Sequence, residues 1–571
     1  METSLPREAW RDHLVALLLA MGLCLAWTLR GWHDLAALRL PDTDDMVRLQ
    51  QIRDWIAGQG FGDLAQHRLG PPPGLEMHWS RLPDLVPAAV IAALTPLLGS
   101  HGAELTALIL SPALLFLAAL LLTGSIARRL GAPAITAVLL AGLAYPATSL
   151  FLPGRIDHHA LQMVLLLLLV RALLGAGTLV AGIVAALAMT ASLDIGLETL
   201  PLLAVGGAAL VALWVADASG SRDRLLGFGL ALPLALAGTS VVLRNSGWAV
   251  PACDGFTALF WRAAQCASLA LLGLALFGAA RATTLRTRGI ASGIAGIAGL
   301  ATVLLLAPQC LHPYGQVDPL LARLWLAEVG EAQALFGTSP ATAIAYAGLA
   351  VVGLVATFII AWKRRDAGWW MLAALMLTAL AITCFQLRGA YAAALLAAPG
   401  LAVMIGAARV RGAPALAAAW IVSTGILYPI AATAIFPPKP EPGANCTAPD
   451  SLARLAALPP GRLLAPLDLG AYALAATPHA VLAAPYHRNN QGNRAMIDFF
   501  LGQPAQSEAI ARQWGIDYVA FCDDDLDRFA KAAAAPHSLA ETLRAGAVPA
   551  WLVPVNTGSE NPRVYRLASR H

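Results

Sequence analysis

Uncharged apolar runs recur along the whole chain, and their length constrains the fold more than any other feature. A helix needs about twenty mostly apolar residues to cross the hydrocarbon core of a bilayer. About thirteen runs are long enough or nearly so, near residues 13–29, 103–124, 132–150, 160–175, 178–193, 197–216, 224–243, 262–280, 289–307, 341–362, 367–384, 389–406 and 414–436. The sequence therefore predicts an all-α polytopic membrane protein. A further run at 85–98 predicts an interfacial helix or half of a broken span.

The composition supports a membrane protein and excludes one class of partner. Hydrophobic residues make up 58% of the chain and charged residues 13%, whereas about a quarter of the residues are charged in typical soluble proteins. The net charge of +4 is spread along the chain. A nucleic-acid-binding protein needs a concentrated basic surface, so we exclude nucleic acid as a partner. No small-residue cleavage site follows the first apolar run, and we expect it to be a retained span rather than a signal peptide.

Lysine and arginine gather in alternate loops between the predicted spans. Clear groups are Arg128 with Arg129, Lys363 to Arg365, and Arg409 with Arg411. Because such residues concentrate in cytoplasmic loops, the N-terminus is predicted to be cytoplasmic. An odd number of spans then places the C-terminal region outside the cytoplasm, together with loops 30–102, 244–261 and 308–340. In a Gram-negative cell, the spans would lie in the inner membrane and these loops in the periplasm.

The composition changes after Phe436. Residues 437–443 read Pro-Pro-Lys-Pro-Glu-Pro-Gly, which predicts a stiff linker between a transmembrane domain at 1–436 and a small α/β extracytoplasmic domain at 437–571. Short apolar runs predict strands near 462–467, 480–484 and 518–522, with helices near 448–458, 494–513 and 524–546. Two of the seven cysteines, Cys446 and Cys522, belong to this region. Outside the cytoplasm they are able to form a disulfide.

The first outer loop contains an acidic cluster. Asp42, Asp44 and Asp45 open a predicted helix that continues through Arg48. Three carboxylates this close invite a divalent cation or supply a general base. The alternative is that they only cap the helix and favour its positive end. The same loop ends in His78-Trp79-Ser80-Arg81, a mixture of polar and aromatic groups just before the chain re-enters the membrane.

Three more polar clusters lie on the predicted outer face. Their members are Arg155, Asp157, His158 and His159 in the second outer loop; Asp194 and Glu198 at i,i+4 spacing; and Glu328 and Glu331 in loop 308–340 with Arg388. Histidines beside a carboxylate bind metal, move protons or contact phosphate, and an outward arginine suits a phosphate group or pairs with an acid. A surface turn without function is the alternative for the cluster in the second outer loop. Their common face favours chemistry at the membrane surface over transport through the bilayer.

This layout resembles the GT-C class of membrane glycosyltransferases, and most closely the catalytic subunits of oligosaccharyltransferases. The resemblance implies a Mg²⁺ or Mn²⁺ ion held by acids of the first two outer loops, matched here by Asp42 or Asp44 and by Asp157. It implies a glutamate from a late outer loop, matched by Glu328 or Glu331. It also implies that Arg388 binds the donor's phosphate, and Arg155, His158 and His159 are expected to assist.

The stretch expected to bind the acceptor differs from the corresponding motif of that family. Residues 466–472 lie where the family has its Trp-Trp-Asp acceptor motif, but here the tryptophans are absent; residues 485–493 resemble the asparagine-rich stretch that follows. The resemblance thus implies transfer of a sugar or oligosaccharide from a polyprenyl-phosphate or polyprenyl-diphosphate donor at the outer membrane face. The acceptor stays open among a glycan, a lipid and a protein group. A transporter or flippase for a lipid-linked substrate and a non-catalytic assembly subunit are the alternative hypotheses.

Overall fold

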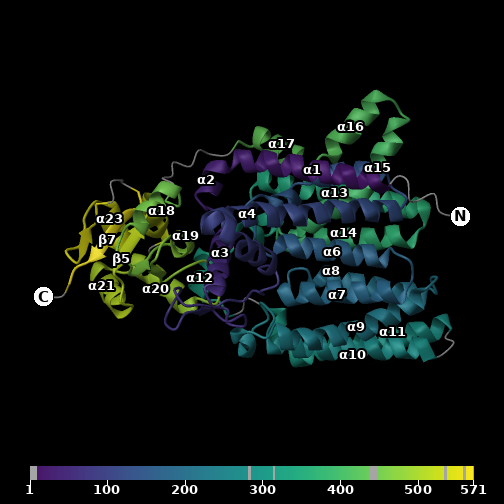
Figure 1. Cartoon of the computed structure of the whole chain (residues 1–571), viewed down its shortest axis with the longest axis horizontal. Coiled ribbons are helices and arrows are strands. Elements are labelled where there is room, and N and C mark those ends of the chain that lie inside the picture. The colour runs from purple at the N-terminus through teal and green to yellow at the C-terminus, as the bar shows by residue number, and fades with distance from the viewer. Residues whose placement is uncertain are drawn as a thin grey trace.

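The computed structural model describes residues 9–280, 284–312, 316–437, 446–532, 537–556 and 561–569. A bundle of apolar helices forms one end of the elongated molecule, and a smaller region with a β-sheet and the C-terminus forms the other (Figure 1). Helix α3 lies between the two. The linker expected at 437–443 lies, from residue 438 on, outside the described residues, so the domain boundary stays a prediction.

The apolar runs form the helices of the bundle. Their bounds are α1 Ala9–Arg30, α4 Leu85–Arg129, α5 Ala134–Gly142, α6 His159–Leu173, α7 Leu179–Ile195, α8 Leu200–Val215, α9 Ser221–Val242, α10 Ala258–Ala280, α11 Leu285–Leu306, α13 Pro340–Arg364, α14 Ala367–Phe385, α15 Gly389–Arg409, α16 Ala413–Ser423 and α17 Leu427–Ile435. Each predicted span overlaps at least one of them.

By length and hydropathy, eight helices of the described residues are able to cross a membrane, and α16 with α17, which meet at 83°, make a ninth if they form one broken span. The shorter apolar helices α6, α7 and α8 lie among them. Helix α5 ends at Gly142 and a 3-10 turn, η1 (Ala147–Phe151), follows it. Pro146 explains the break, because proline lacks the amide that a continuing helix needs. The prediction of a polytopic helical membrane protein is confirmed.

Helix α4 differs from its predicted form. The apolar run at 85–98 and the span at 103–124 belong to one helix of 45 residues that bends at Gly99, where φ is 70°. Glycine adopts this left-handed conformation without the steric penalty of a side chain. The segment at 85–98 is therefore joined to a membrane span across a kink.

The C-terminal region contains a five-stranded mixed sheet in the order β4-β3-β5-β7-β6, parallel between β3 and its two neighbours and antiparallel elsewhere. The strands are β3 Arg462–Leu464, β4 Ala480–Val481, β5 Tyr518–Phe521, β6 Leu552–Pro554 and β7 Arg563–Leu567, and the helices are α18 Pro449–Ala456, α19 Leu467–Ala476, α20 Asn490–Leu501, α21 Pro504–Gln513, α22 Asp523–Ala532 and α23 Leu539–Arg544. The three predicted strands are present. Strands β6 and β7 were not predicted, because a proline in β6 and two arginines in β7 weaken the apolar pattern.

The loop between α1 and α4, the first of the predicted outer loops, packs against the edge of this sheet. It contains α2 (Trp32–Ala36), α3 (Thr43–Ile56), β1 (Ala65–Gln66) and β2 (Leu75–Glu76). Leu69 forms a parallel bridge with Val481, and the hydroxyl of Tyr472 in α19 donates to the carbonyl of Leu40 at 2.9 Å. Arg68 donates to three carbonyls at the end of α19 and in the turn that follows it. These contacts place the N-terminus of α3 at the junction of the bundle and the sheet.

Two disulfides join segments at the end of the bundle that meets the C-terminal region. Cys446 pairs with Cys522, as expected, and Cys253 pairs with Cys310. The second bond connects loop 244–261, which contains η2 (Ser246–Ala249), to loop 308–340. The latter loop contains η3 Pro308–Leu311, α12 Pro319–Leu324, η4 Leu326–Glu328, η5 Gly330–Ala332 and η6 Leu335–Gly337. The loop that contains Glu331 is thus tied at its start.

Candidate active site

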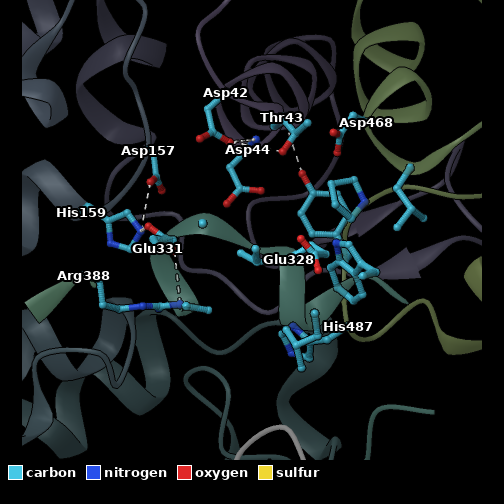
Figure 2. Close-up of a pocket in the computed structure, with 18 of the residues that line it drawn as sticks. Asp42, Thr43, Asp44, Asp157, His159, Glu328, Glu331, Arg388, Asp468 and His487 are labelled. Carbon is cyan, nitrogen blue, oxygen red and sulfur yellow. Dashed lines mark hydrogen bonds and ion pairs between the residues drawn. The ribbon is translucent and has the colours of Figure 1, made fainter. Parts of the chain in front are cut away.

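A cavity of about 680 Å³ lies where the outer loops of the bundle meet the C-terminal region. Acidic side chains from α3 and from the second outer loop point toward histidine and arginine side chains on its other walls (Figure 2). Its charged and histidine lining residues are Asp42, Asp44, His78, Arg155, Asp157, His158, His159, Glu198, Asp254, Glu328, Glu331, Arg388, Asp468, His487 and Arg528. Residues far apart in the sequence therefore meet in one cavity.

The start of α3 gives its three acids different surroundings. Asp42 is the N-cap, and its carboxylate accepts hydrogen bonds from the amide of Asp44 at 3.1 Å and from Arg155 at 2.8 Å. Asp45 is fully buried and accepts hydrogen bonds from two backbone amides of the second outer loop at 2.8 and 2.9 Å. Asp44 points into the cavity (Figure 2). Asp42 and Asp44 both line the cavity, Asp42 while it is bonded to Arg155, whereas Asp45 is fully buried and holds the second loop.

The position of Asp44 changes its acidity. Burial raises the pKa of Asp44 to about 7, and the charges of Asp42 and Asp157 act in the same direction. A carboxyl group that titrates near neutral pH is suited to accept a proton from a reacting group.

Asp157 orients two histidines in the second outer loop. Its Oδ1 contacts Nδ1 of His158, and its Oδ2 lies 3.4 Å from Nε2 of His159 and 3.5 Å from Nη2 of Arg155. Burial alone would raise the pKa of Asp157, but the charges of His158, His159 and Arg155 hold it well below its usual range. The side chain is therefore an ionised carboxylate at neutral pH.

Two glutamates connect these histidines to Arg388 at the start of α15. Oε1 of Glu198, between α7 and α8, lies 3.4 Å from Nε2 of His158 and 3.8 Å from Nη1 of Arg388. Glu331, in η5, lies 3.2 Å from Nε2 of His159 and 3.3 Å from Nη2 of Arg388. Together with the aspartate between the two histidines, these residues form a closed ring of alternating acidic and basic side chains, here called the acid–base ring.

A further cluster at the cavity was not predicted. Asp254 accepts hydrogen bonds from Arg488 at 2.6 and 2.7 Å, and its carboxylate lies 2.6 Å from Nε2 of His487. The ring of His487 lies 4.6 Å from that of His78. The stretch 485–493 stood out in the sequence only for its resemblance to an asparagine-rich segment. No local pattern pairs Asp254 with a residue 234 positions away.

Solved structures share this architecture across almost the whole chain. Archaeal oligosaccharyltransferase AglB from Archaeoglobus fulgidus, in complex with an inhibitory peptide and a dolichol-phosphate, matches with a TM-score of 0.68 and 14% identity over 99% of this chain and 75% of that one. The Archaeoglobus fulgidus oligosaccharyltransferase in complex with Zn and sulfate matches with a TM-score of 0.62 and 14% identity over 97% and 73%. The chain has the GT-C fold of an oligosaccharyltransferase catalytic subunit. No family model and no curated protein matches the sequence.

A third solved structure matches both the membrane helices and the C-terminal region. The same organism's oligosaccharyltransferase, tethered to an acceptor peptide that contains the NVT sequon, has a TM-score of 0.65 and 13% identity over 99% of this chain and 75% of that one. The similarity includes the C-terminal region as well as the membrane helices. With the apolar helices, it identifies a multi-pass membrane protein with an AglB-like fold.

The cavity contains side chains that fit a metal ion. Asp157, His158 and His159 each offer a ligand atom, and these atoms lie within 4.8 Å of one another. Asp44 and Glu331 face the same space from other walls (Figure 2). Imidazole nitrogen combined with carboxylate oxygen suits Mn²⁺ or Zn²⁺, whereas Mg²⁺ prefers oxygen ligands. The identity of the ion stays a prediction.

Two arginines predicted in the first loop lie away from the cavity lining. Arg48 is fully buried, pairs with Asp84 at 2.6 Å and lies 4.5 Å over the ring of Trp79. Arg81 lies 3.4 Å from the same aspartate and donates to backbone carbonyls of the loop. These contacts keep the loop folded and position α3.

Of three further predicted site residues, two line the cavity and one does not. Asp194 is buried at the outer end of α7, where Thr239 donates to it at 3.3 Å, and it is not among the residues that line the cavity. His78 and Glu328 do line the cavity. His78 is half-buried, whereas Glu328 is exposed.

Proposed function

We propose that this chain is a membrane glycosyltransferase that moves a sugar or oligosaccharide from a polyprenyl-phosphate or polyprenyl-diphosphate donor to an acceptor at the outer membrane face. The observation that carries the proposal is the convergence of Asp44, Asp157 and Arg388 on one cavity at the junction of the membrane helices and the outer region. AglB, which has the same fold, has been solved with a dolichol-phosphate. A lipid-linked sugar phosphate suits a site whose one side is membrane and whose other side is water.

The proposed reaction is a displacement that inverts the anomeric carbon. A heteroatom of the acceptor attacks that carbon from the face opposite the phosphate. The new glycosidic bond forms as the carbon–oxygen bond to the phosphate breaks, and the bonding electrons leave with the polyprenyl phosphate. Asp44, the cavity-facing acid of α3, accepts the acceptor's proton, because a carboxylate with a pKa near neutral is a competent base.

Positive groups on the opposite wall stabilise the leaving phosphate. Arg388 binds its oxygens, since a guanidinium group matches phosphate geometry with two parallel hydrogen bonds. His158 adds a second positive group beside it, and Arg155 supports Asp157 from behind. Asp157 and His159 would hold a divalent ion, which supplies further positive charge to the phosphate when bound.

The disulfides support the proposed orientation. Cys253, Cys310, Cys446 and Cys522 are all paired on the cavity side of the molecule. Disulfides form and persist outside the reducing cytoplasm. The cavity would therefore face the extracytoplasmic side, and the opposite end of α1, where Asp12 pairs with Arg128, the cytoplasm.

The acceptor side of the cavity supports a substrate other than a sequon peptide. Leu467 and Asp468, in the first turn of α19, line the wall that would meet the acceptor. They lie in the stretch that resembles the position of the family's tryptophan motif, whose aromatic rings are missing here. A glycan, a lipid-linked sugar or a different protein group therefore fits the proposal better.

Sugar transfer from a panel of polyprenyl-linked donors tests the function. Purified wild type is compared with Asp44→Ala and Asp157→Ala, with and without EDTA, using glycan, lipid and peptide acceptors. Transfer by wild type that both substitutions abolish would support the enzyme and its site. A folded wild type that releases and transfers no sugar from any donor, but moves lipid across vesicle membranes, would support the transporter hypothesis instead.

A further inference from the structure

Glu198 is held in a fixed position at the edge of the cavity. Its Oε2 accepts a hydrogen bond at 3.0 Å from Nε2 of Gln162, a fully buried side chain of α6. Gly196, two residues earlier, leaves free the space that the carboxylate fills, because a Cβ at that position would meet Oε2 of Glu198. The neighbouring helix and the local backbone therefore both determine where this carboxylate lies.

Two positive groups face the other oxygen of this carboxylate. Nε2 of His158 and Nη1 of Arg388 lie 3.4 and 3.8 Å from Oε1 of Glu198, and the two side chains are 6% and 10% exposed. The guanidinium of Arg388 carries a fixed charge and Nε2 of His158 is able to donate a hydrogen bond, so these poorly hydrated groups need an anionic acceptor between them. Glu198 supplies that charge and keeps both donors aimed at one point.

Glu198 also lies at the boundary between the polar cavity and a smaller hollow among the membrane helices. Together with Arg388 it lines the polar main cavity and a small hollow formed by residues of the membrane helices, among them Met163, Leu202 and Ile382. A lipid-linked phosphate has its sugar on one side and its apolar chain on the other. The phosphate of such a molecule is suited to this boundary.

A function as a metal ligand explains these contacts less well. The group that fits a metal ion consists of Asp157, His158 and His159. Glu198 is not part of that group, and its Oε1 lies 3.8 Å from Nη1 of Arg388, whose permanent positive charge would repel a metal ion at Glu198.

We propose that Glu198 is a positioning residue for the donor phosphate, which holds His158 and Arg388 side by side so that both bind oxygens of one lipid-linked phosphate. The inference rests on the proposed function, because it takes the donor to be a polyprenyl-phosphate compound. Glu198 acts through the two cations and does not itself bind the phosphate, since two anions would repel.

Two substitutions test this in different ways. Glu198→Gln removes the charge and keeps the shape of the side chain. Gly196→Ala keeps the charge but moves the carboxylate, because the added Cβ takes its place. Each is expected to weaken binding of polyprenyl phosphate, measured directly with the purified protein in lipid nanodiscs, by about tenfold or more, as is typical when a hydrogen bond to a charged group is lost. The donor KM should rise in proportion while the acceptor KM stays at the wild-type value.

Asp217→Asn is the matched control. Asp217 lies 2.6 Å from Nη1 of Arg288, at the other end of α8 and away from the cavity. Asparagine tolerates its left-handed φ of 58°. Asp217→Asn also removes an ion-paired carboxylate, but it should leave polyprenyl-phosphate binding unchanged. Glu198→Asp retains the charge with a shorter reach and is expected to bind with intermediate affinity.

The outcomes separate the inference from the function on which it rests. Wild-type affinity in both Glu198→Gln and Gly196→Ala, with normal thermal unfolding, would overturn the inference and leave the proposed function standing. Donor and acceptor KM values that rise equally would also overturn it, because they indicate a general distortion. A folded wild type that neither binds polyprenyl phosphate nor transfers sugar would overturn the proposed function, and this inference with it.

Discussion

Asp42, Asp44 and Asp45 are close neighbours in the chain, yet each meets different partners. Successive helical residues point about 100° apart around the axis, so Asp44 lines the cavity whereas Asp45 does not. Asp42 caps α3 and binds Arg155, and Asp45 binds backbone amides of the second outer loop. Their functions therefore differ although their chemistry is the same.

Replacement of Asp44 should separate catalysis from binding. Asp44→Asn keeps the size of the side chain but removes the base, and general-base catalysis typically contributes about a hundredfold or more. We expect kcat to fall at least that far while polyprenyl-phosphate affinity changes by less than about threefold. Single-turnover transfer and direct lipid binding measure the two quantities. Full activity of Asp44→Asn would show that another group takes the proton.

The mixed set of histidine and carboxylate ligands predicts a metal preference. EDTA should abolish transfer, and Mn²⁺ should restore it at lower concentration than Mg²⁺, because imidazole binds the more oxygen-selective Mg²⁺ poorly. Substituting His159→Asp replaces one imidazole nitrogen with carboxylate oxygen and should shift the preference toward Mg²⁺. Transfer that is unaffected by exhaustive EDTA treatment would contradict a metal requirement.

The charge of Asp254 links a loop of the bundle to the C-terminal region through His487 and Arg488. Burial alone would raise the pKa of Asp254, but hydrogen bonds from Arg488 and His487 hold it far below its usual range. A carboxyl whose pKa is lower in the folded than in the unfolded chain stabilises the protein above the unfolded pKa of about 4 and loses this effect as the pH falls further.

Asp254→Asn should therefore destabilise the protein in a pH-dependent way. We expect a loss of about 3 kcal/mol at pH 7, the range typical when one partner of a buried ion pair is removed. The difference in thermal unfolding between wild type and variant should shrink as the pH is lowered below about 4. A difference that stays constant with pH would mean that the charge of Asp254 is not its stabilising feature.

At the scale of elements, the disulfide between Cys253 and Cys310 ties together two outer loops, one of which contains Glu331. Removing the bond leaves the helices intact but gives loop 308–340 more conformational freedom. The double variant Cys253→Ser, Cys310→Ser should show faster limited proteolysis within this loop and a lower rate of transfer, since Glu331 contacts His159 and Arg388. Unchanged proteolysis and activity would show that the loop is held by its other contacts.

The sequence predicted elements well where one feature dominates the local energetics. Membrane helices are such a case, because every backbone amide and carbonyl must be satisfied inside the apolar layer. The sequence did not predict the bend at Gly99, the break at Pro146 or the short strands β6 and β7. Whether a proline or glycine breaks, bends or ends an element depends on packing with neighbouring elements, which local sequence does not specify.

At the scale of the whole molecule, the odd number of predicted spans and the position of the disulfides lead to one topology. A reporter that is active only outside the cytoplasm, such as alkaline phosphatase, should be active when fused to the C-terminus. The same reporter fused before α1 should be inactive, whereas a cytoplasmic fluorescent reporter at that end should be bright. Equal reporter behaviour at the two ends would require an even number of spans.

By itself, the sequence determined the membrane environment, the helical bundle with its small α/β C-terminal region, and the polar clusters that gather on one face. These follow from hydrophobicity, helix length and charge, which act locally along the chain. The tertiary structure decided which acid of α3 faces the cavity, that Arg48 and Arg81 support the fold, and that Glu198 joins His158 to Arg388. Contacts between residues distant in the sequence depend on how the helices pack and where the loops cross, and a single sequence does not encode those positions in any local pattern.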